Sequence, residues 1–330
     1  MNNKVLSIIG GSGFIGTRLC KLIDYKGGEF EIIDKQISKS FPNKHKMADV
    51  RDLDSLRSTI QGDVIINLAA EHRDDVTPKS LYDDVNVEGV RNLCKVAVEK
   101  NIRKIIFTSS VAVYGFSPVD TGEQGEINYF NDYGRTKFLA EEVLREWYHQ
   151  DAKNRSLIIL RPTVVFGEQN RGNVYNLLKQ IAKGNFMMIG TGKNVKSMAY
   201  VGNIVECLDY LSTKLEGYHL YNYIDKPDLT MNQLVKSVND QLGRKSNTNF
   251  YIPYGIGMLA GYFLDGFAKL SGKKLDISSI RVKKFCSDTS FSTSIAKTGF
   301  VPSKSLESGL KNTVQYEFVE QNHGELFFSE

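Results

Sequence analysis

Val5-Leu6-Ser7-Ile8-Ile9-Gly10-Gly11-Ser12-Gly13-Phe14-Ile15-Gly16 is the stretch that decides the fold, because it joins an uninterrupted apolar run to a glycine-rich turn. Such a run is typical of a strand buried on both faces of a parallel sheet, and residues 17–23 continue as a helix. The glycines satisfy both GxGxxG and the wider GxxGxxG spacing, which lets the backbone approach a pyrophosphate at the helix N-terminus. A glycine turn with a plain helix cap and no ligand is the alternative. The candidate pyrophosphate contacts are Gly10, Gly13, Phe14, Ile15 and Gly16.

An acidic residue stands where a dinucleotide-binding fold needs one. The second apolar run, residues 30–33, ends in Asp34, close to the spacing of about 20 residues at which a carboxylate meets the adenosine ribose hydroxyls. A carboxylate would repel a 2′-phosphate, so Asp34 favours NAD over NADP. Lys35 follows directly and weakens this preference, because an ammonium would attract that phosphate. We expect both side chains to lie beside the cofactor, with NAD preferred.

A second motif supplies the chemistry. If residues 136–144 form a helix, Tyr133 and Lys137 stand one turn apart on the same face. A phenol has a pKa near ~10, so a phenolate that acts at neutral pH needs a fixed positive neighbour, which Lys137 would supply. Tyr133 is therefore a candidate general base or acid. The alternative is a tyrosine and a lysine on the surface of an amphipathic helix.

Further apolar runs continue the alternation of strand and helix. They predict strands near residues 46–48, 64–67 and 104–107. Leu68-Ala69-Ala70 and Thr108-Ser109-Ser110 follow the last two runs. Small residues at the carboxyl end of a strand leave room for a cofactor to lie across the sheet, and the Ser110 hydroxyl would reach the same crevice as Tyr133.

The fold that follows is an α/β fold in two parts. We predict a Rossmann-type doubly wound parallel sheet with a smaller mixed α/β substrate lobe towards the C-terminus. A chain of 330 residues with 41% hydrophobic residues has ample material for one large domain or two smaller ones. The predicted NAD-binding domain is 1–170, with 198–226 returning to it, and the predicted substrate lobe is 171–197 with 227–330.

Composition excludes several other classes of protein. The net charge of +4 contains no block of like charges, so nothing favours a nucleic-acid partner. The four cysteines form no CxxC pair, which argues against a zinc site or a disulfide framework and fits a reducing cytoplasm. The run 71–75 contains His and Asp, but adjacent positions rarely converge on one ion, so we expect no metal and assign Arg73 to substrate contact. No run reaches the ~20 apolar residues of a membrane span.

The order of these elements resembles the extended short-chain dehydrogenase/reductases, in particular the NAD-dependent sugar epimerase/dehydratase family. The likeness rests on the glycine loop, Asp49-Val50, Leu68-Ala69-Ala70, Ser109-Ser110 with Tyr114-Gly115, Tyr133 with Lys137, and Leu160-Arg161-Pro162. It implies that Lys137 also bonds the nicotinamide ribose. The further cofactor contacts that it implies are Asp49 and Val50 at the adenine, Leu68, Ala69 and Ala70 at the nicotinamide, Ser109, and the backbone of Pro162 and Thr163.

The implied chemistry begins with oxidation of a sugar hydroxyl. Tyr133 as a phenolate takes the hydroxyl proton, Ser110 holds or relays that oxygen, and NAD accepts the hydride from the carbon. The dehydratases that the chain resembles keep an Asp-Glu pair directly after the catalytic hydroxyl residue, where this chain has Val111 and Ala112. Dehydration is therefore disfavoured, which leaves an epimerase, a dehydrogenase that releases the keto sugar, or a reductase. Asp34 weighs against a reductase that draws on NADPH.

The second half offers groups for a diphosphate and contains one unusual apolar run. Arginine forks match phosphate oxygens, although a solvated surface is the alternative for each cation. Residues 250–264 carry no charge, and basic residues follow them up to Lys284. This run is too short to span a bilayer, so it is either a buried helix of the lobe or an interfacial helix with basic residues towards anionic lipid. The candidate substrate contacts are Arg73, Ser110, Asn173, Ser197 and Arg281.

A closer resemblance covers nearly the whole chain. Segments 70–76, 170–178, 196–201 and 223–228 are similar to the bacterial O-antigen 4-epimerases, which make GalNAc from GlcNAc on undecaprenyl diphosphate or on UDP. Residues 196–201 replace the Arg-Asp-Tyr-type segment common in UDP-sugar epimerases, which favours the lipid-linked sugar. The resemblance implies an NAD-dependent 4-epimerase with a 4-keto intermediate, a homodimer, in the cytoplasm or on the inner face of the cytoplasmic membrane through 250–284. The alternatives are a UDP-GlcNAc or UDP-glucose 4-epimerase, a nucleotide-sugar dehydrogenase or 4-reductase, and a non-catalytic NAD-sensing regulator.

Overall fold

A parallel sheet forms the centre of the molecule. The computed structural model describes residues 4–73, 76–244, 251–271, 278–320, 322 and 324–328. Its largest sheet has seven strands in the order β11-β6-β5-β4-β1-β2-β3, and every pair of neighbours runs parallel. The strands are Leu6–Ile9 (β1), Phe30–Asp34 (β2), His45–Met47 (β3), Val64–Asn67 (β4), Lys104–Thr108 (β5), Ser156–Pro162 (β6) and Tyr218–Tyr223 (β11). The predicted Rossmann-type α/β fold is confirmed.

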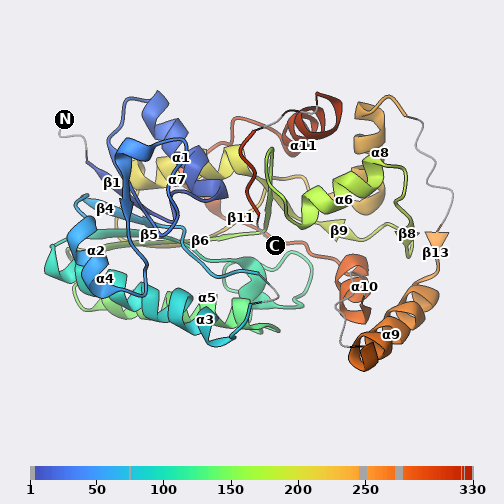
Figure 1. The fold of residues 1–330 in the computed structure, drawn as a ribbon, viewed down its shortest axis with the longest axis horizontal. Helices are drawn as coiled ribbons and strands as arrows, with labels where there is room; N and C mark the ends of the chain where they lie inside the picture. Colours follow the sequence, from blue (N-terminus) through green and yellow to red (C-terminus); the bar gives the residue numbers. More distant parts are fainter. Residues whose placement is uncertain are drawn as a thin grey trace.

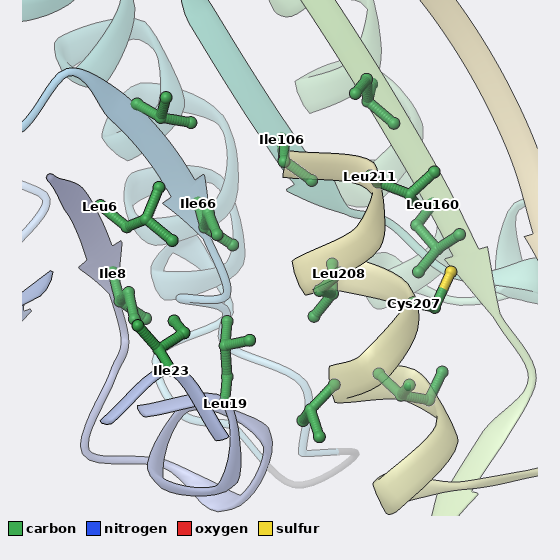
Figure 2. Packing of buried hydrophobic residues seen from close by; sticks show 14 of the residues in the cluster. Leu6, Ile8, Leu19, Ile23, Ile66, Ile106, Leu160, Cys207, Leu208 and Leu211 are labelled. Atoms are coloured by element: carbon green, nitrogen blue, oxygen red, sulfur yellow. The ribbon is translucent and has the colours of Figure 1, made fainter. Parts of the chain in front are cut away.

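Helices cover both faces of this sheet (Figure 1). The helices of one face are α1 (Phe14–Tyr25) and α7 (Val201–Lys214); those of the other face are α2 (Leu53–Thr59), α4 (Gly89–Glu99) and α5 (Asp132–His149). Figure 2 shows how α1 and α7 point apolar side chains at the first face, among them Leu19, Ile23, Leu208 and Leu211. Both faces of the strands are therefore buried, as the uninterrupted apolar runs predicted.

The direction in which strands are added reverses next to β1. From β1 the chain builds β2 and β3 on one side and then β4, β5 and β6 on the other. Doubly wound sheets bind ligands in the crevice outside the carboxyl ends of the strands at this reversal. The glycine loop leaves β1 at that point, and residues 68–70 leave β4 beside it.

Smaller elements form a second layer beside the sheet. The two-stranded pairs are β7 (Val164–Phe166) with β10 (Met198–Tyr200), β8 (Met188–Ile189) with β13 (Tyr251–Ile252), and β9 (Val195–Lys196) with β12 (Leu229–Thr230). The helices here are α6 (Asn173–Ala182), α8 (Met231–Gln241), α9 (Tyr254–Ser271), α10 (Ser279–Cys286) and α11 (Leu306–Val314). A separate apolar cluster holds α6, α8 and α11 together around Leu178, Leu234 and Leu310. The exact division of the chain into domains stays a prediction.

Short helical turns complete the path of the chain. They are α3 (Ser80–Asp83), the 3₁₀ turns Pro42–Lys44, Val111–Tyr114 and Ile295–Thr298, and the π-helical turns Asp84–Glu88 and Gln315–Val319. The turn Val111–Tyr114 directly follows the carboxyl end of β5, so it brings Ser110 to the crevice.

The apolar helix α9 lies at the outer edge of the molecule, beside α10 and away from the sheet (Figure 1). Its large side chains are exposed: Leu259 is 71% exposed, Tyr262 61% and Phe263 74%. Of the two alternatives for 250–264, a buried helix or an interfacial one, the described part does not fit the buried helix, because no other described element covers this face of α9. Contact with a membrane stays a prediction. No helix among the described residues is long and apolar enough to cross a membrane.

Candidate active site

The glycine loop after β1 forms a cradle with no room for side chains. Gly10 has a φ of 77°, and a Cβ there would lie 2.7 Å from the Ala69 backbone nitrogen. A Cβ on Gly16 would lie 2.5 Å from the Gly10 carbonyl oxygen. Helix α1 begins at Phe14, and Gly13 at its N-cap brings no side chain to its first-turn amides. Bare amides at a helix N-terminus suit a pyrophosphate, so this loop fits a dinucleotide.

The acid at the end of β2 is held in place by the same loop. The Asp34 carboxylate accepts hydrogen bonds from the backbone N–H of Ser12 at 3.0 Å and of Gln36 at 2.9 Å. Lys35 is exposed next to it. A carboxylate fixed at this position suits the ribose hydroxyls of NAD and opposes a 2′-phosphate.

The predicted adenine contacts lie on the adjoining loop after β3. The pKa of Asp49 is lowered, first by a hydrogen bond from Arg51 and to a smaller degree by the nearby charge of Lys35. Arg51 Nη2 lies 2.7 Å from Asp49 Oδ2. Val50 packs against Gly89 of α4, where a Cβ would lie 2.7 Å from a Val50 methyl carbon. The pair therefore sits at the rim of the crevice, between β3 and α4.

The segment after β4 is fixed by a buried asparagine. Asn86, in the π-helical turn, accepts a hydrogen bond from the Glu71 backbone N–H at 2.7 Å and donates one to its carbonyl at 2.8 Å. It also donates to the Thr136 hydroxyl of α5 at 2.9 Å. Residues 68–70, the predicted nicotinamide contacts, are thereby tied to the helix that carries Tyr133. Sequence reasoning missed Asn86, whose one signal is a polar residue within an otherwise helical, partly apolar stretch.

Ser110 and Tyr133 meet at the crevice. Ser110 caps the turn Val111–Tyr114, where its hydroxyl accepts from the Ala112 N–H at 3.1 Å. Asn131 caps α5 by accepting from the Gly134 N–H at 2.9 Å, which places Tyr133 in the first turn of that helix. Burial raises the pKa of Tyr133 to about 12, and a hydrogen bond with Ser110 opposes that rise.

Lys137 lies one turn further along α5 and is almost fully buried, with 2% of its surface exposed. Its ammonium donates to the Thr108 carbonyl at 2.6 Å and lies 4.5 Å from the centre of the Phe107 ring. Burial lowers the pKa of Lys137 to about 7, while the charge of Glu141 opposes the fall. Burial thus raises the pKa of Tyr133, and the Lys137 ammonium is turned to the β5 carbonyl. The lowering expected from Lys137 together with the positive nicotinamide stays a prediction.

Beneath these residues lies a buried ionic cluster. Glu141 of α5 and Arg161 of β6 are 0% and 2% exposed and form an ion pair, with Arg161 Nε 2.8 Å from Glu141 Oε1. Arg161 also donates to the Tyr114 hydroxyl at 2.7 Å, which in turn donates to the Asn222 side-chain carbonyl at 2.8 Å. The Ser109 hydroxyl, a predicted cofactor contact, donates to Glu141 instead of pointing into the crevice.

The remaining predicted cofactor contacts lie at the end of β6. Pro162 ends that strand, and the Thr163 N–H donates to the Tyr223 carbonyl of β11 at 3.1 Å. Thr163 is 6% exposed, so it can meet a cofactor only along a narrow strip of backbone.

The predicted substrate contacts differ in how far their side chains are exposed. Asn173 is exposed at the start of α6, Arg281 is exposed on α10, and Arg73 is exposed after β4. Ser197 is 3% exposed; its hydroxyl donates to Asp228 at 2.8 Å and accepts from the Phe291 N–H at 3.1 Å. The hydroxyl of Ser197 is thus engaged within the protein, and its role in substrate binding stays a prediction.

The run 71–75 is too compact for a metal site by its sequence alone. Asp74 and Asp75 lie outside the described residues. Among the residues that the structure does describe, no group of three or more His, Cys, Asp or Glu side chains could hold a metal ion.

A dinucleotide cradle and a helix with Tyr133 and Lys137 converge on one crevice of a doubly wound sheet, which defines a dehydrogenase-type enzyme of the short-chain class. The sequence profile of the NAD dependent epimerase/dehydratase family matches residues 6–223, and the chain belongs to that family. The predicted resemblance and NAD as the cofactor are therefore confirmed.

Two characterised relatives differ greatly in their similarity to this chain. The chain is 52% identical to the N-acetyl-alpha-D-glucosaminyl-diphospho-ditrans,octacis-undecaprenol 4-epimerase of Escherichia coli O157:H7, with 99% of each chain covered. It is 27% identical to the UDP-glucose 4-epimerase of Vibrio cholerae, with 97% of each covered. Both relatives are 4-epimerases, so the expectation of an isomerase is confirmed.

Solved structures share the fold at lower identity. The UDP-N-acetylglucosamine 4-epimerase of Methanobrevibacter ruminantium M1, in complex with UDP-N-acetylmuramic acid, is 21% identical with a TM-score of 0.74, over 98% of this chain and 100% of that one. The UDP-glucose 4-epimerase of Thermus thermophilus in complex with NAD is 18% identical with a TM-score of 0.70, over 94% and 98%. These likenesses establish the fold alone.

Proposed function

We propose that the protein is an NAD-dependent 4-epimerase that interconverts GlcNAc and GalNAc linked to undecaprenyl diphosphate, for the synthesis of O-antigen or another surface polysaccharide. The observation that carries this proposal is the pairing of Ser110 with Tyr133 at the crevice beside the glycine cradle. Support for the carrier comes from the full-length relative, which is named for an undecaprenol-linked substrate. Val111 and Ala112 still disfavour a dehydratase.

Residues of the chain accept the proton of the sugar 4-hydroxyl and return it. Tyr133 takes this proton as the 4-keto intermediate forms and returns it when the hydroxyl is restored with the opposite configuration. Ser110, hydrogen-bonded to Tyr133, holds the same sugar oxygen. Bound NAD supplies a reversible hydride acceptor and, in its oxidised form, a positive charge. The glycine cradle and Asp34 hold it, and Lys137 completes the site from α5.

Because the pKa of Tyr133 is raised, the positive charge of the cofactor is expected to help form the phenolate. In the protein alone Tyr133 stays protonated at neutral pH, because its pKa is about 12. A neighbouring positive charge favours a phenolate, and Glu141 helps Lys137 to keep its own proton. The positive charge of oxidised NAD would therefore help Tyr133 to act as a base.

We test the function by epimerisation with purified, NAD-loaded protein. UDP-GlcNAc and undecaprenyl-diphosphate-GlcNAc are offered in parallel, and the GlcNAc and GalNAc products are separated. Conversion of the lipid-linked substrate alone supports the proposal. Conversion of UDP-GlcNAc alone assigns the protein to the UDP-sugar epimerases. Accumulation of NADH without either product assigns it to the dehydrogenases, and cofactor binding without any turnover indicates a sensor.

We further propose that 250–284 contacts the inner face of the cytoplasmic membrane. In the described part of this region, α9 exposes a face of large apolar residues: Ile256, Leu259, Tyr262, Phe263 and Phe267. Exposed cations such as Lys269 and Arg281 lie on α9 and α10, which suits an anionic lipid surface. Co-sedimentation with phosphatidylglycerol vesicles is expected, and Leu259→Ser with Phe263→Ser should abolish it. Tyr25→Ser, an exposed aromatic change on α1, is the control.

We also propose a homodimer through α4 and α5, as is frequent for enzymes of this fold. Within the described residues, the outward faces of these helices are mostly polar, with Val98 at 51% exposure as the exception. The interface would thus be a polar one with one apolar contact. Light scattering at several protein concentrations tests it, and a monomeric mass at every concentration contradicts it.

A further inference from the structure

Two exposed phenylalanines stand together beside the catalytic residues. Phe116 is 42% exposed and Phe130 is 44% exposed, and their ring centroids lie 5.0 Å apart with an angle of 30° between the rings. Phe116 follows the turn that Ser110 caps, and Phe130 directly precedes Asn131, the cap of α5. Exposed aromatic pairs of this kind are a common feature of ligand and partner sites.

The pair is held rigidly near Tyr133. Phe130 precedes Tyr133 by three residues, so their Cα atoms are at most about 11 Å apart. Gly115 has a φ of 62°, and a Cβ there would lie 2.0 Å from the Asn128 carbonyl oxygen. The Asn128 N–H also donates to the Val113 carbonyl at 3.0 Å. The two ends of this loop are therefore packed together, and Phe116 and Phe130 form one platform.

Helix α10 places two ammonium groups over this platform. Lys283 Nζ lies 4.9 Å from the centre of the Phe116 ring, and Lys284 Nζ lies 4.6 Å from the centre of the Phe130 ring. The contact between a cation and an exposed ring is weak, so the exposed Lys283 ammonium can turn to a phosphate oxygen at little cost, and Lys284 adds a second positive charge beside it. The platform thus joins an apolar surface to two cations, next to the atoms that react.

This combination matches one substrate chemistry. A polyprenyl-diphosphate sugar presents, in order, a sugar, two phosphates and a branched apolar chain. With the sugar at Tyr133, the next groups of such a molecule meet cations and then aromatic rings. Helix α10 carries Lys283 and Lys284 and packs closely against α9, the helix with the exposed apolar face. An apolar chain that extends from the platform along α10 would lead towards that face.

We propose that Phe116 and Phe130, together with Lys283 and Lys284, form the site for the diphosphate and the first isoprene units of a polyprenyl-linked sugar. This inference rests on the proposed function and adds a subsite to it. The lysines neutralise the diphosphate, and the rings cover the isoprene units next to it. Recognition of the carrier then happens within the protein, apart from any contact between α9 and a membrane.

Short soluble substrates test this subsite without vesicles. GlcNAc linked to geranyl diphosphate has two isoprene units, and GlcNAc linked to methyl diphosphate has none. For the NAD-loaded wild-type protein we expect a KM at least 10-fold lower for the geranyl compound. In the variant Phe116→Ala with Phe130→Ala this preference should fall below about 3-fold. Tyr25→Ala, which removes an exposed aromatic ring on α1, should retain the wild-type preference.

The lysines should behave differently from the rings. Lys283→Ala with Lys284→Ala should raise KM for both compounds by a similar factor of at least 5, because both compounds carry the diphosphate. If the wild-type protein shows no preference for the geranyl compound over the methyl compound, the proposal is overturned. So does a ring variant that weakens UDP-GlcNAc as much as the geranyl compound, because the platform then serves a nucleotide base.

A binding measurement separates this inference from the proposed function. Calorimetric titration of NAD-loaded protein with geranyl diphosphate and with methyl diphosphate needs no turnover. Tighter binding of geranyl diphosphate that disappears in the ring variant supports the subsite even if no sugar is epimerised. Equal affinities for the two diphosphates refute the subsite even if the epimerase assay succeeds. Retention of NAD by each variant shows that it has folded.

Discussion

The two longest helices of the described structure contrast in composition and burial. Helices α5 and α9 both have 18 residues. α5 is rich in charged residues, yet it buries Lys137, Glu141 and Trp147. α9 is almost free of charge, yet it exposes Leu259 and Phe263. The burial of a helix therefore depends on the elements that cover it, and not on its composition alone. α5 packs against both the sheet and α4, whereas α9 packs chiefly on α10.

The two helices also differ in what their sequences had to encode. α5 must hold ionisable groups out of water at fixed positions, so each of them needs a partner: Lys137 has the Thr108 carbonyl, and Glu141 has Arg161. α9 has two charged residues, Asp265 and Lys269; the Asp265 carboxylate accepts from the Ser279 N–H at 3.1 Å, and most of the other side chains form an apolar surface. Substitutions in α5 should therefore change catalysis and stability, whereas substitutions in α9 should change association.

The largest expected effect comes from Tyr133 on α5. Tyr133→Phe removes the hydroxyl that moves the proton, so turnover of GlcNAc should fall by roughly 10²–10⁴-fold. The ring remains, so NAD should stay bound with wild-type stoichiometry. Tyr148→Phe on the same helix is the matched control. Wild-type turnover in Tyr133→Phe would contradict the mechanism.

The next effect is on stability and comes from the buried ion pair. Glu141→Gln leaves the buried guanidinium of Arg161 uncompensated, which should lower the free energy of unfolding by about 3–5 kcal/mol. Urea titration followed by tryptophan fluorescence measures it, since Trp147 lies on the same helix and is buried. Glu146→Gln, an exposed change on α5, is the control. An equal loss in both variants would show that Arg161 does not depend on Glu141.

A matched pair of leucines compares the two helices directly. Leu144 of α5 is 1% exposed and Leu259 of α9 is 71% exposed. Leu144→Ala should cost about 2–5 kcal/mol of unfolding free energy, because it leaves a cavity. Leu259→Ala should change that free energy by less than about 0.5 kcal/mol and should weaken binding to anionic vesicles. A large loss of stability in Leu259→Ala would mean that α9 is covered in solution, for example by a second copy of the chain.

The smallest effect is a dependence of stability on pH. The pKa of Lys137 falls from 10.5 to about 7 on folding, so between these values the unfolded chain binds more protons than the folded protein. Its contribution to the free energy of unfolding therefore rises with pH across this window. We expect the increase between pH 7 and pH 9 to be smaller in Lys137→Met than in the wild-type protein. Lys95→Met on α4 should match the wild-type slope.

Sequence reasoning succeeded where a function depends on neighbours in the chain. The strand, turn and helix around the glycine loop follow from one continuous stretch, and Asp34 follows from a short spacing after it. Tyr133 and Lys137 lie on one helix, so their shared position at the crevice was also predictable. These features together define the Rossmann-type fold and the predicted NAD site.

Features that depend on distant partners could not be predicted. The Ser197 hydroxyl donates to Asp228, and the Ser109 hydroxyl donates to Glu141. The sequence around each serine does not indicate these partners. Whether α9 is buried stayed open for the same reason, because an apolar sequence does not say whether another element covers it. The rise in the pKa of Tyr133 was not predictable either, because it comes from burial, a property of the whole fold.

The cluster under the active site has a consequence for the newly made chain. The Tyr114 hydroxyl donates to Asn222, which is 108 residues further along. A ribosome adds about 5–20 residues per second, so roughly 5–20 s pass before this acceptor is synthesised. During that interval the hydroxyl of Tyr114 has to be satisfied by water. The final packing of the buried cluster around Arg161 and Tyr114 is therefore complete only after β11 has been synthesised and has docked.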